Sequence, residues 1–178
     1  AGQSRRDRLI QPERVMQVIG IRRGMKIGIV GAGRGYFTFK MNLKVGSRGK
    51  IYANEIDEYN LEYIRDHCEQ EEIRNVIPVQ GQMDDPCFPI DNLDMVFMCY
   101  VFHDLEKPVQ LLQNIKKYLR KKGLLVILDQ DREKTGNDHF YRKSKILRLI
   151  KQAGYRIDRI EDFLKREILV ISSDPDSG

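Results

Sequence analysis

The chain has 178 residues, of which 41% are hydrophobic and 32% are charged, and its formal net charge is +5. This composition excludes a disordered chain and allows one domain with a substantial core. No apolar run approaches the roughly 18 residues of a membrane span, and the polar, basic opening is unlike a signal peptide. We therefore expect a cytoplasmic protein with no membrane partner; an export signal cleaved before Ala1 stays open. The modest positive charge permits a nucleic-acid partner without favouring one.

The first residues predict an arm followed by the start of a domain. Residues 1–10 are polar and basic, which predicts a flexible N-terminal arm. Residues 11–14 (Gln-Pro-Glu-Arg) predict a helix start, because proline suits the first helical position and an acid suits the positive end of the helix dipole. We expect a single domain over residues 11–173 and a disordered tail over residues 174–178.

A glycine-rich turn comes next. Met25–Val30 predicts a strand and Tyr36–Val45 a helix, with Gly31, Gly33 and Gly35 between them. Glycine tolerates positive φ and lets a ligand approach the backbone closely. The free N–H groups at the start of a helix favour a carboxylate or a phosphate. The turn therefore predicts a ligand site, although a strand–turn–helix unit without a ligand has the same pattern.

The spacing of these glycines bears on the ligand. They form GxGxG, whereas dinucleotide sites carry GxGxxG, in which the third glycine allows close helix–strand packing. In this chain that last position is Tyr36. The spacing therefore does not favour a dinucleotide.

An acidic residue follows at a distance that suits this turn. Residues 51–56 predict a second strand, and Glu55 near its end lies 22 positions after Gly33. In Rossmann-like folds an acid about 20 residues further on accepts hydrogen bonds from ribose hydroxyls. Alone, Glu55 would be interpreted as a solvated charge. Together with the glycine turn it predicts a nucleoside site.

Strands and helices alternate along the rest of the chain. The predicted elements are a helix over 58–72, strands over 76–80 and 93–99, a helix over 108–119, a strand over 123–129, a helix over 139–153, and strands over 155–163 and 167–172. This alternation predicts an α/β fold with a mostly parallel sheet. The last two strands have no helix between them and predict an antiparallel hairpin at its edge. Five basic residues over 116–122 favour a solvated helix end over an RNA-binding patch.

These motifs, in this order, resemble the class I S-adenosylmethionine (SAM)-dependent methyltransferase superfamily, and small bacterial methyltransferase-domain proteins within it. The matching segments are residues 11–15, 31–38, 55, 84–86, 93–104 and 119–126. The resemblance implies SAM as the cofactor. It also implies a Rossmann-like three-layer sandwich, with a seven-stranded, mostly parallel sheet and an antiparallel edge strand.

The resemblance also implies which residues bind the cofactor. The glycine turn would hold the methionine end, Glu55 and Ile56 the ribose and adenine, and Met83 and Asp84 the adenine edge. The predicted cofactor-binding residues are Gly31, Ala32, Gly33, Gly35, Tyr36, Glu55, Ile56, Met83, Asp84, Cys99 and Tyr100.

Methyl transfer from a sulfonium needs alignment more than acid–base chemistry. His103 and Asp104 follow the fourth predicted strand and are the candidate catalytic residues. His103 would act as a base where the acceptor must lose a proton, because its ordinary pKa is about 6.5. The alternative is a loop histidine that packs against the next helix. We expect no metal site, because His67, His103 and His139 lack metal-ligand spacing.

Two departures from the family pattern leave the function open. Ile29 stands where these enzymes usually carry an acid that helps to place the methionine ammonium group, and Gln82 stands where many relatives have Asp. The leading hypothesis is a monomeric or homodimeric methyltransferase that acts on a small-molecule acceptor. The alternatives are a SAM- or adenosine-binding protein with weak or no catalysis, and an RNA methyltransferase.

Overall fold

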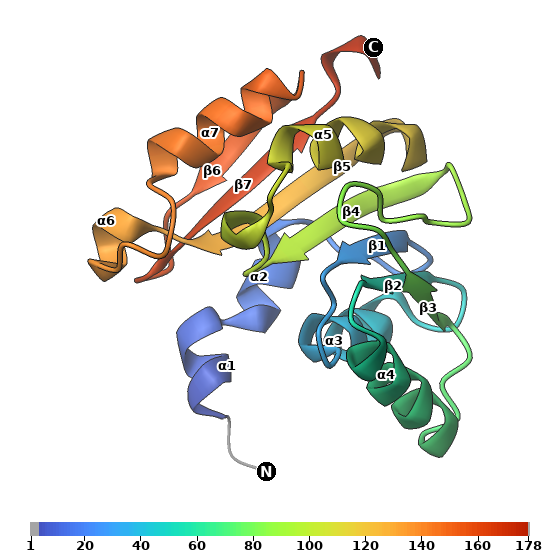
Figure 1. The fold of residues 1–178 in the computed structure, drawn as a ribbon. Coiled ribbons are helices and arrows are strands. Elements are labelled where there is room, and N and C mark those ends of the chain that lie inside the picture. The colour runs from blue at the N-terminus through green and yellow to red at the C-terminus, as the bar shows by residue number, and fades with distance from the viewer. Residues whose placement is uncertain (1–3, 178) are drawn as a thin grey trace.

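The computed structural model describes residues 4–177, which form a seven-stranded sheet with helices on both faces (Figure 1). The strands are β1 (Lys26–Val30), β2 (Lys50–Glu55), β3 (Val76–Gln80), β4 (Leu93–Cys99), β5 (Leu119–Gln130), β6 (Arg156–Glu161) and β7 (Glu167–Ser173). Their order across the sheet is β3-β2-β1-β4-β5-β7-β6. Strands β1 to β5 pair in parallel, and β7 is antiparallel to both of its neighbours. The predicted fold class is confirmed, and the antiparallel strand lies one place inside the edge.

The helices form the two outer layers of the sandwich. They are α1 (Arg5–Ile10), α2 (Pro12–Val18), α3 (Tyr36–Val45), α4 (Glu58–Gln70), α5 (Pro108–Ile115), α6 (Arg132–Thr135) and α7 (Lys143–Gln152), with 3-10 turns η1 (Phe102–Asp104), η2 (Lys116–Tyr118) and η3 (Pro175–Ser177). Helices α2, α3 and α4 pack on one face of the sheet, and α5 and α7 pack on the other (Figure 1).

Strand β4 explains why the centre of the sheet is apolar on both sides. Met95 and Phe97 point into the core under α3, whereas Val96 and Met98 point into the core under α5. The Phe97 ring packs 4.8 Å from the ring of Phe37 on α3, measured between centroids. Because successive strand residues face opposite sides, the middle of a strand that is covered on both faces is a continuous apolar run.

The order of the strands places a crevice between β1 and β4. The chain leaves β1 for α3 on one face of the sheet and leaves β4 for α5 on the other. Helices that depart in opposite directions leave a gap at the carboxyl ends of the two strands, where open α/β sheets bind their ligands.

The predicted flexible arm is corrected for the part that the structure describes. Residues 5–10 form α1, which begins where the Asp7 backbone N–H donates to Ser4 Oγ at 3.0 Å. Ile10 is only 2% exposed and belongs to the core. A polar six-residue helix has little stability alone, so its packing against the domain decides its structure. Residues 1–3 lie outside the described residues.

The predicted disordered tail is corrected in a similar way. Residues 175–177 form the turn η3, and Asp174 makes an ion pair with Lys116 at 3.3 Å. Gly178 lies outside the described residues.

The predicted helix over residues 139–153 is wrong in its first part. Helix α7 begins at Lys143, and the short helix α6 precedes it. The side chain of Asp131 accepts from the Glu133 N–H that starts α6, at 3.0 Å, and from the Lys143 N–H, at 3.2 Å. Gly136, with φ of +67°, ends α6. His139 therefore lies in a loop rather than on a helix.

The structure also differs from the predicted boundary between the helix over 108–119 and the strand over 123–129. Helix α5 ends at Ile115, and β5 begins at Leu119 rather than at Gly123. The early part of β5 shifts register against β4.

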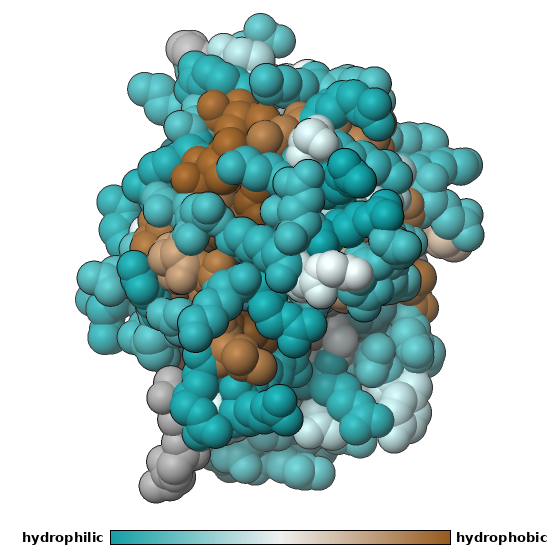
Figure 2. Space-filling model, turned by 90° about the vertical axis from the view of Figure 1, so that its left-hand side faces the viewer, coloured by the Kyte–Doolittle hydropathy of each residue, from teal (hydrophilic) through white to brown (hydrophobic). Residues whose placement is uncertain are grey.

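The surface is largely hydrophilic on the face drawn in Figure 2, where hydrophobic side chains form separate patches. Within residues 4–177, no helix combines the length and the apolar character needed to cross a membrane.

Candidate active site

A cavity of about 730 Å³ opens at the carboxyl ends of β1, β2 and β4. Its walls come from residues 29–34, residues 54–56 and residues 99–101, together with parts of the loops that follow β3 and β4. This volume lies within the roughly 300–1,000 Å³ typical of small-molecule sites. The protein's own side chains do not fill the crevice, so a ligand has room beside the glycine turn.

Two glycines of the turn serve different purposes. Gly31 has φ of +67°, and a Cβ there would lie 2.3 Å from Cγ2 of Val101, so glycine is needed for packing. Gly33 has φ of +55°, and a Cβ there would meet nothing within 4 Å. Gly33 therefore presents open backbone to the cavity. Gly35 is the residue that precedes α3 and does not line the cavity, so its predicted cofactor role is not supported.

Glu55 at the end of β2 links the strand to this turn. It is 8% exposed, and its carboxylate accepts hydrogen bonds from the backbone N–H groups of Gly33 (2.8 Å), Ile56 (2.9 Å) and Asp57 (3.3 Å). A carboxylate has about four acceptor positions, so one is left for a ligand hydroxyl. The amides also offset the cost of burying the charge.

The end of β4 is held rigidly by β7. Tyr100 adopts φ of +59°, and its hydroxyl donates to Glu167 Oε1 at 2.5 Å. Burial and the neighbouring carboxylate raise the pKa of Tyr100 well above its ordinary value. A positive φ at a residue other than glycine costs about 1–3 kcal/mol, and such residues are common at ligand sites.

Cys99 lines the cavity but is unsuited to act as a nucleophile. Burial raises the pKa of its thiol far above the ordinary value. The thiolate is the reactive form of cysteine. Cys99 therefore contributes a neutral wall to the cavity.

Helix α1 contributes a residue that sequence reasoning missed. The Arg6 guanidinium lies 3.8 Å from the centre of the Tyr36 ring and lines the cavity. The Tyr36 hydroxyl donates to Asp7 Oδ1 at 2.5 Å, and Lys40 makes an ion pair with Asp7 at 3.3 Å. The only feature of the sequence that pointed to Arg6 as a cavity residue was its positive charge, in a segment predicted to be flexible.

His103 does not face the cavity. Its Nδ1 lies 2.8 Å from Asp129 Oδ1, its backbone N–H donates to Asp129 Oδ2 at 3.0 Å, and its side chain is 5% exposed. Burial lowers the pKa of His103, but the hydrogen bond and charge of Asp129 and the charge of Asp104 outweigh burial and raise it. The predicted role as a base beside the acceptor is therefore not supported for His103. Asp104 does line the cavity.

Of the remaining predicted residues, some line the cavity and one does not. Met83 and Ile56, which are 53% and 52% exposed, leave apolar surface on the cavity wall. Asp84 does not line the cavity, because its carboxylate accepts from Gln110 Nε2 at 3.0 Å and its carbonyl accepts from Asn114 Nδ2 at 2.7 Å. The predicted contact of Asp84 with the ligand is not supported. Gln82 lines the cavity in its place.

Most of the predicted site residues meet at one cavity. Those that line it are Gly31, Ala32, Gly33, Tyr36, Glu55, Ile56, Met83, Cys99, Tyr100 and Asp104.

A family model described as "Methyltransferase domain" matches residues 21–159, which contain nearly the whole cavity wall. The chain belongs to the class I SAM-dependent methyltransferases. A SAM-dependent methyltransferase from Aquifex aeolicus has a similar structure, with a TM-score of 0.88 and 25% identity, over 96% of this chain and 93% of that one.

Two curated relatives match this chain in sequence and have different acceptors in their names. A probable cobalt-precorrin-6B C(15)-methyltransferase (decarboxylating) from Sulfurisphaera tokodaii is 29% identical over 78% of this chain and 66% of its own length. A tRNA (adenine(58)-N(1))-methyltransferase catalytic subunit from Yarrowia lipolytica is 29% identical over 59% of this chain and 27% of its own length. The chain thus spans only part of the curated relatives that it matches.

The lining of the cavity suits SAM in its chemistry and in its charge. The open backbone at Gly33 suits close approach of the methionine part, the free acceptor position of Glu55 suits a ribose hydroxyl, and Ile56 and Met83 suit the base. Ile29, buried at 2% exposed, supplies no acid beneath the turn. Negative charge comes instead from the cavity-lining acids Asp104 and Glu106, which suits a ligand that carries a sulfonium and an ammonium.

Proposed function

We propose that this chain transfers a methyl group from SAM to a small-molecule acceptor bound in the same cavity. The observation that carries the proposal is the cavity of about 730 Å³ that continues from Gly33 and Glu55 to Asp104. Its volume exceeds what a cofactor of SAM's size needs, which leaves space for an acceptor of modest size.

Each wall of the cavity has a defined role in this proposal. SAM supplies a methyl group that its sulfonium already activates, so the protein mainly needs to hold and align the reactants. Glu55 would accept a ribose hydroxyl, and Gly33 would let the methionine part approach the backbone. Tyr100, fixed by Glu167, would form a rigid wall at the carboxyl end of β4. Asp104 is the cavity-lining acid that follows β4, and it would face the acceptor.

A small acceptor is supported over RNA by the acidic partners of three of the five basic residues over 116–122. Lys116 pairs with Asp174 at 3.3 Å, and Arg120 pairs with Asp94 at 2.6 Å. Lys117 also pairs with an acid, Asp85. Cations that are neutralised within the protein contribute less to phosphate binding. The name of the Sulfurisphaera relative supports a small molecule, whereas the match to the tRNA enzyme covers 27% of that protein.

Calorimetric titration tests the cofactor, and label transfer tests the reaction. We expect SAM and S-adenosylhomocysteine to bind with one site per chain, and NAD not to bind. Incubation with methyl-labelled SAM and fractionated small metabolites should label a small molecule. Binding of NAD without binding of SAM would contradict the methyltransferase function. Binding of SAM without transfer to small metabolites or RNA would favour the alternative that Ile29 motivates, a binding protein without catalysis. Labelled RNA would favour an RNA methyltransferase.

A further inference from the structure

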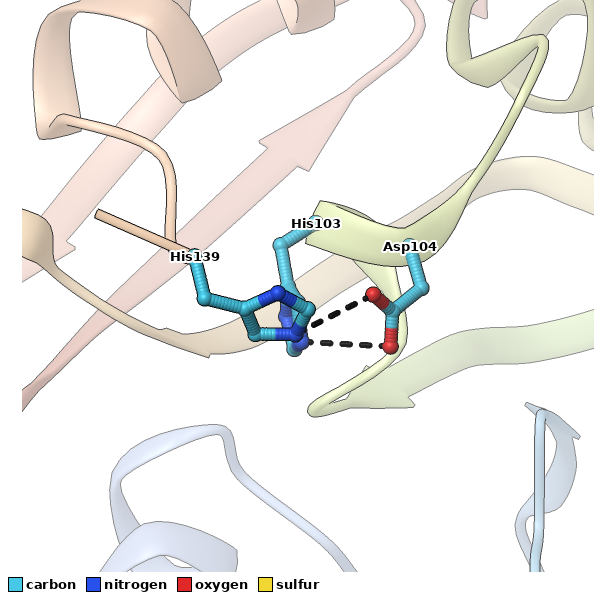
Figure 3. A group of neighbouring side chains, drawn as sticks. All are labelled: His103, Asp104 and His139. Carbon is cyan, nitrogen blue, oxygen red and sulfur yellow. Dashed lines mark ion pairs between the residues drawn. The ribbon is translucent and has the colours of Figure 1, made fainter. Parts of the chain in front are cut away.

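Three side chains converge beside the cavity, although one of them is distant from the other two in the sequence. His103 and Asp104 come from η1, directly after β4, and His139 comes from the loop between α6 and α7 (Figure 3). One ligand atom from each of these residues lies within 4.8 Å of the other two. Among residues 4–177, this is the group of histidine and acidic side chains whose atoms come close enough to share an ion.

Two contacts within the group, which end on different oxygens of Asp104, have distances close to those between the ligands of a bound transition metal ion. The Nε2 atom of His103 lies 3.2 Å from Asp104 Oδ2, and the Nε2 atom of His139 lies 3.3 Å from Asp104 Oδ1. Tetrahedral ligands about 2.0–2.1 Å from a zinc ion are roughly 3.3 Å from one another. Small side-chain movements would therefore bring all three atoms to coordination distance.

A buried carboxylate orients one of the histidines. Asp129 is 0% exposed, and it accepts from the backbone N–H of His103 and lies against His103 Nδ1 at 2.8 Å. This contact favours the tautomer with the proton on Nδ1, which leaves Nε2 with a lone pair. Histidines that bind metals commonly donate their other N–H to a carboxylate in this way. The ring of Phe140 also packs against His103, with centroids 4.6 Å apart.

The same geometry favours a positive charge at the centre of the group. With the proton of His103 on Nδ1, its Nε2 lone pair would face an oxygen of Asp104 across 3.2 Å. Two lone pairs at this distance repel each other unless a second proton or a cation lies between them. The Nε2 atom of His139 lies 3.3 Å from the other oxygen of the same carboxylate. A cation between the three groups would contact both histidines and Asp104, whereas a proton on His103 satisfies only its own contact with Asp104.

We propose that His103, Asp104 and His139 bind a divalent transition metal ion with the preferences of Zn²⁺. Two imidazole nitrogens and one carboxylate suit Zn²⁺ and similar ions, whereas Mg²⁺ and Ca²⁺ prefer sites made of oxygen. Three protein ligands leave at least one position open for water or another oxygen donor. The prediction of no metal site was based on the spacing of histidines along the chain. Such spacing cannot reveal that the loop between α6 and α7 folds back onto η1.

The position of this metal site relates it to the cavity. Asp104 belongs to both, because its carboxylate contacts the two histidines and its residue lines the cavity wall. The ion would therefore stand at the edge of the space assigned to the methyl acceptor. This consequence rests on the proposed function, but binding of the ion does not.

Metal binding can be measured without SAM on full-length protein that carries no histidine tag and has been stripped with a chelator. ZnCl₂ is titrated by calorimetry, and Co²⁺ is titrated by its visible absorption, which reports the ligands and geometry of the ion. We expect one site per chain, with His139→Ala and Asp104→Asn each weakening Zn²⁺ binding by about tenfold or more. His139 and Asp104 are exposed, so neither variant disturbs the core.

His67→Ala is the matched control, because His67 packs against Phe39 and is the remaining histidine of the chain. Its Zn²⁺ affinity should equal that of the wild type. The proposal is overturned if the wild type binds no Zn²⁺ or Co²⁺, or if all three variants bind Zn²⁺ as the wild type does. Titration of the metal-free protein with SAM tests the cofactor separately, so the failure of either proposal is recognised without the other.

Discussion

Two buried carboxylates lie near the ends of two strands of the same sheet, and they have different structural roles. Glu55 at the end of β2 accepts from three backbone N–H groups and so shapes the chain around the cavity. Asp129 at the end of β5 accepts from two backbone N–H groups and also contacts the ring of His103. The first carboxylate organises a backbone surface, and the second orients a side chain. A ligand that needs close approach suits the first region, and an ion that needs aligned donor atoms suits the second.

Removal of the Asp129 carboxylate should have the largest effect of these changes, and this effect is on the stability of the fold. Asp129→Ala leaves three hydrogen-bonding groups without their acceptor at a site that is 0% exposed, where water cannot easily replace it. We expect a loss of about 3 kcal/mol in the free energy of unfolding, measured with urea. Asp138→Ala is the control, because this exposed residue pairs with Arg132 at the surface and should cost less than about 1 kcal/mol. Equal losses would show that Asp129 does not anchor this region.

Removal of Glu55 should act mainly on the ligand. The N–H groups of Ile56 and Asp57 lie beside exposed side chains, so water can replace the carboxylate and the stability should fall by only about 1 kcal/mol. Binding of SAM should weaken by about 1–3 kcal/mol in Glu55→Ala, measured by calorimetry. Glu58→Ala, which removes an exposed ion pair with Arg65, should leave SAM affinity unchanged. Unchanged affinity in Glu55→Ala would refute its role in the cavity.

The role of the open backbone at Gly33 in binding SAM can be tested with two Gly→Ala variants that introduce similar backbone strain. Gly33 and Gly20 both have positive φ, and a Cβ at either would meet nothing within 4 Å. Gly33→Ala and Gly20→Ala should therefore cost a similar 1–2 kcal/mol, roughly, in the free energy of unfolding. We expect only Gly33→Ala to weaken SAM binding, by about tenfold. A similar loss of SAM affinity in both variants would mean that strain, rather than access to the backbone, matters at Gly33.

The carboxylate of Asp7, which is near the surface, should contribute the least to stability. The hydrogen bond from Tyr36, with those from Lys40 and Ser4, holds the pKa of Asp7 below its ordinary value of 3.8 against the effect of burial. Since the folded pKa is the lower one, the stabilisation is present above pH 3.8 and is lost as the pH falls through the folded pKa. Contact between α1 and α3 should weaken over that range.

Tyr36→Phe should move the pKa of Asp7 toward 3.8, as measured by NMR titration of its carboxyl group. Tyr59→Phe removes a hydroxyl elsewhere on the surface and should leave that pKa unchanged. If Tyr36→Phe has no effect, the hydrogen bond does not hold α1 in place.

Prediction from the sequence brought together residues that line one cavity where these residues are close along the chain. The glycine turn lies within one strand–turn–helix unit, and Glu55 follows at the distance that a parallel strand pair requires. It failed where a contact depends on how a loop folds. His103 and Asp129 are 26 residues apart, and His139 reaches His103 and Asp104 because the chain between α6 and α7 turns back. Arg6 was missed for a related reason, since α1 is too short to predict and is held by the contact of Asp7 with Tyr36.

The sequence by itself determined the sheet, its helical layers and the edge that carries the cavity, because hydrophobic periodicity and turn chemistry act between near neighbours in the chain. Only the tertiary structure decided which polar atoms share that edge. The packing of η1 and the loop after α6 turned His103 away from the cavity and toward Asp129, and brought His139 to Asp104. Side-chain direction depends on contacts between distant segments, and the order of residues along the chain does not specify these locally.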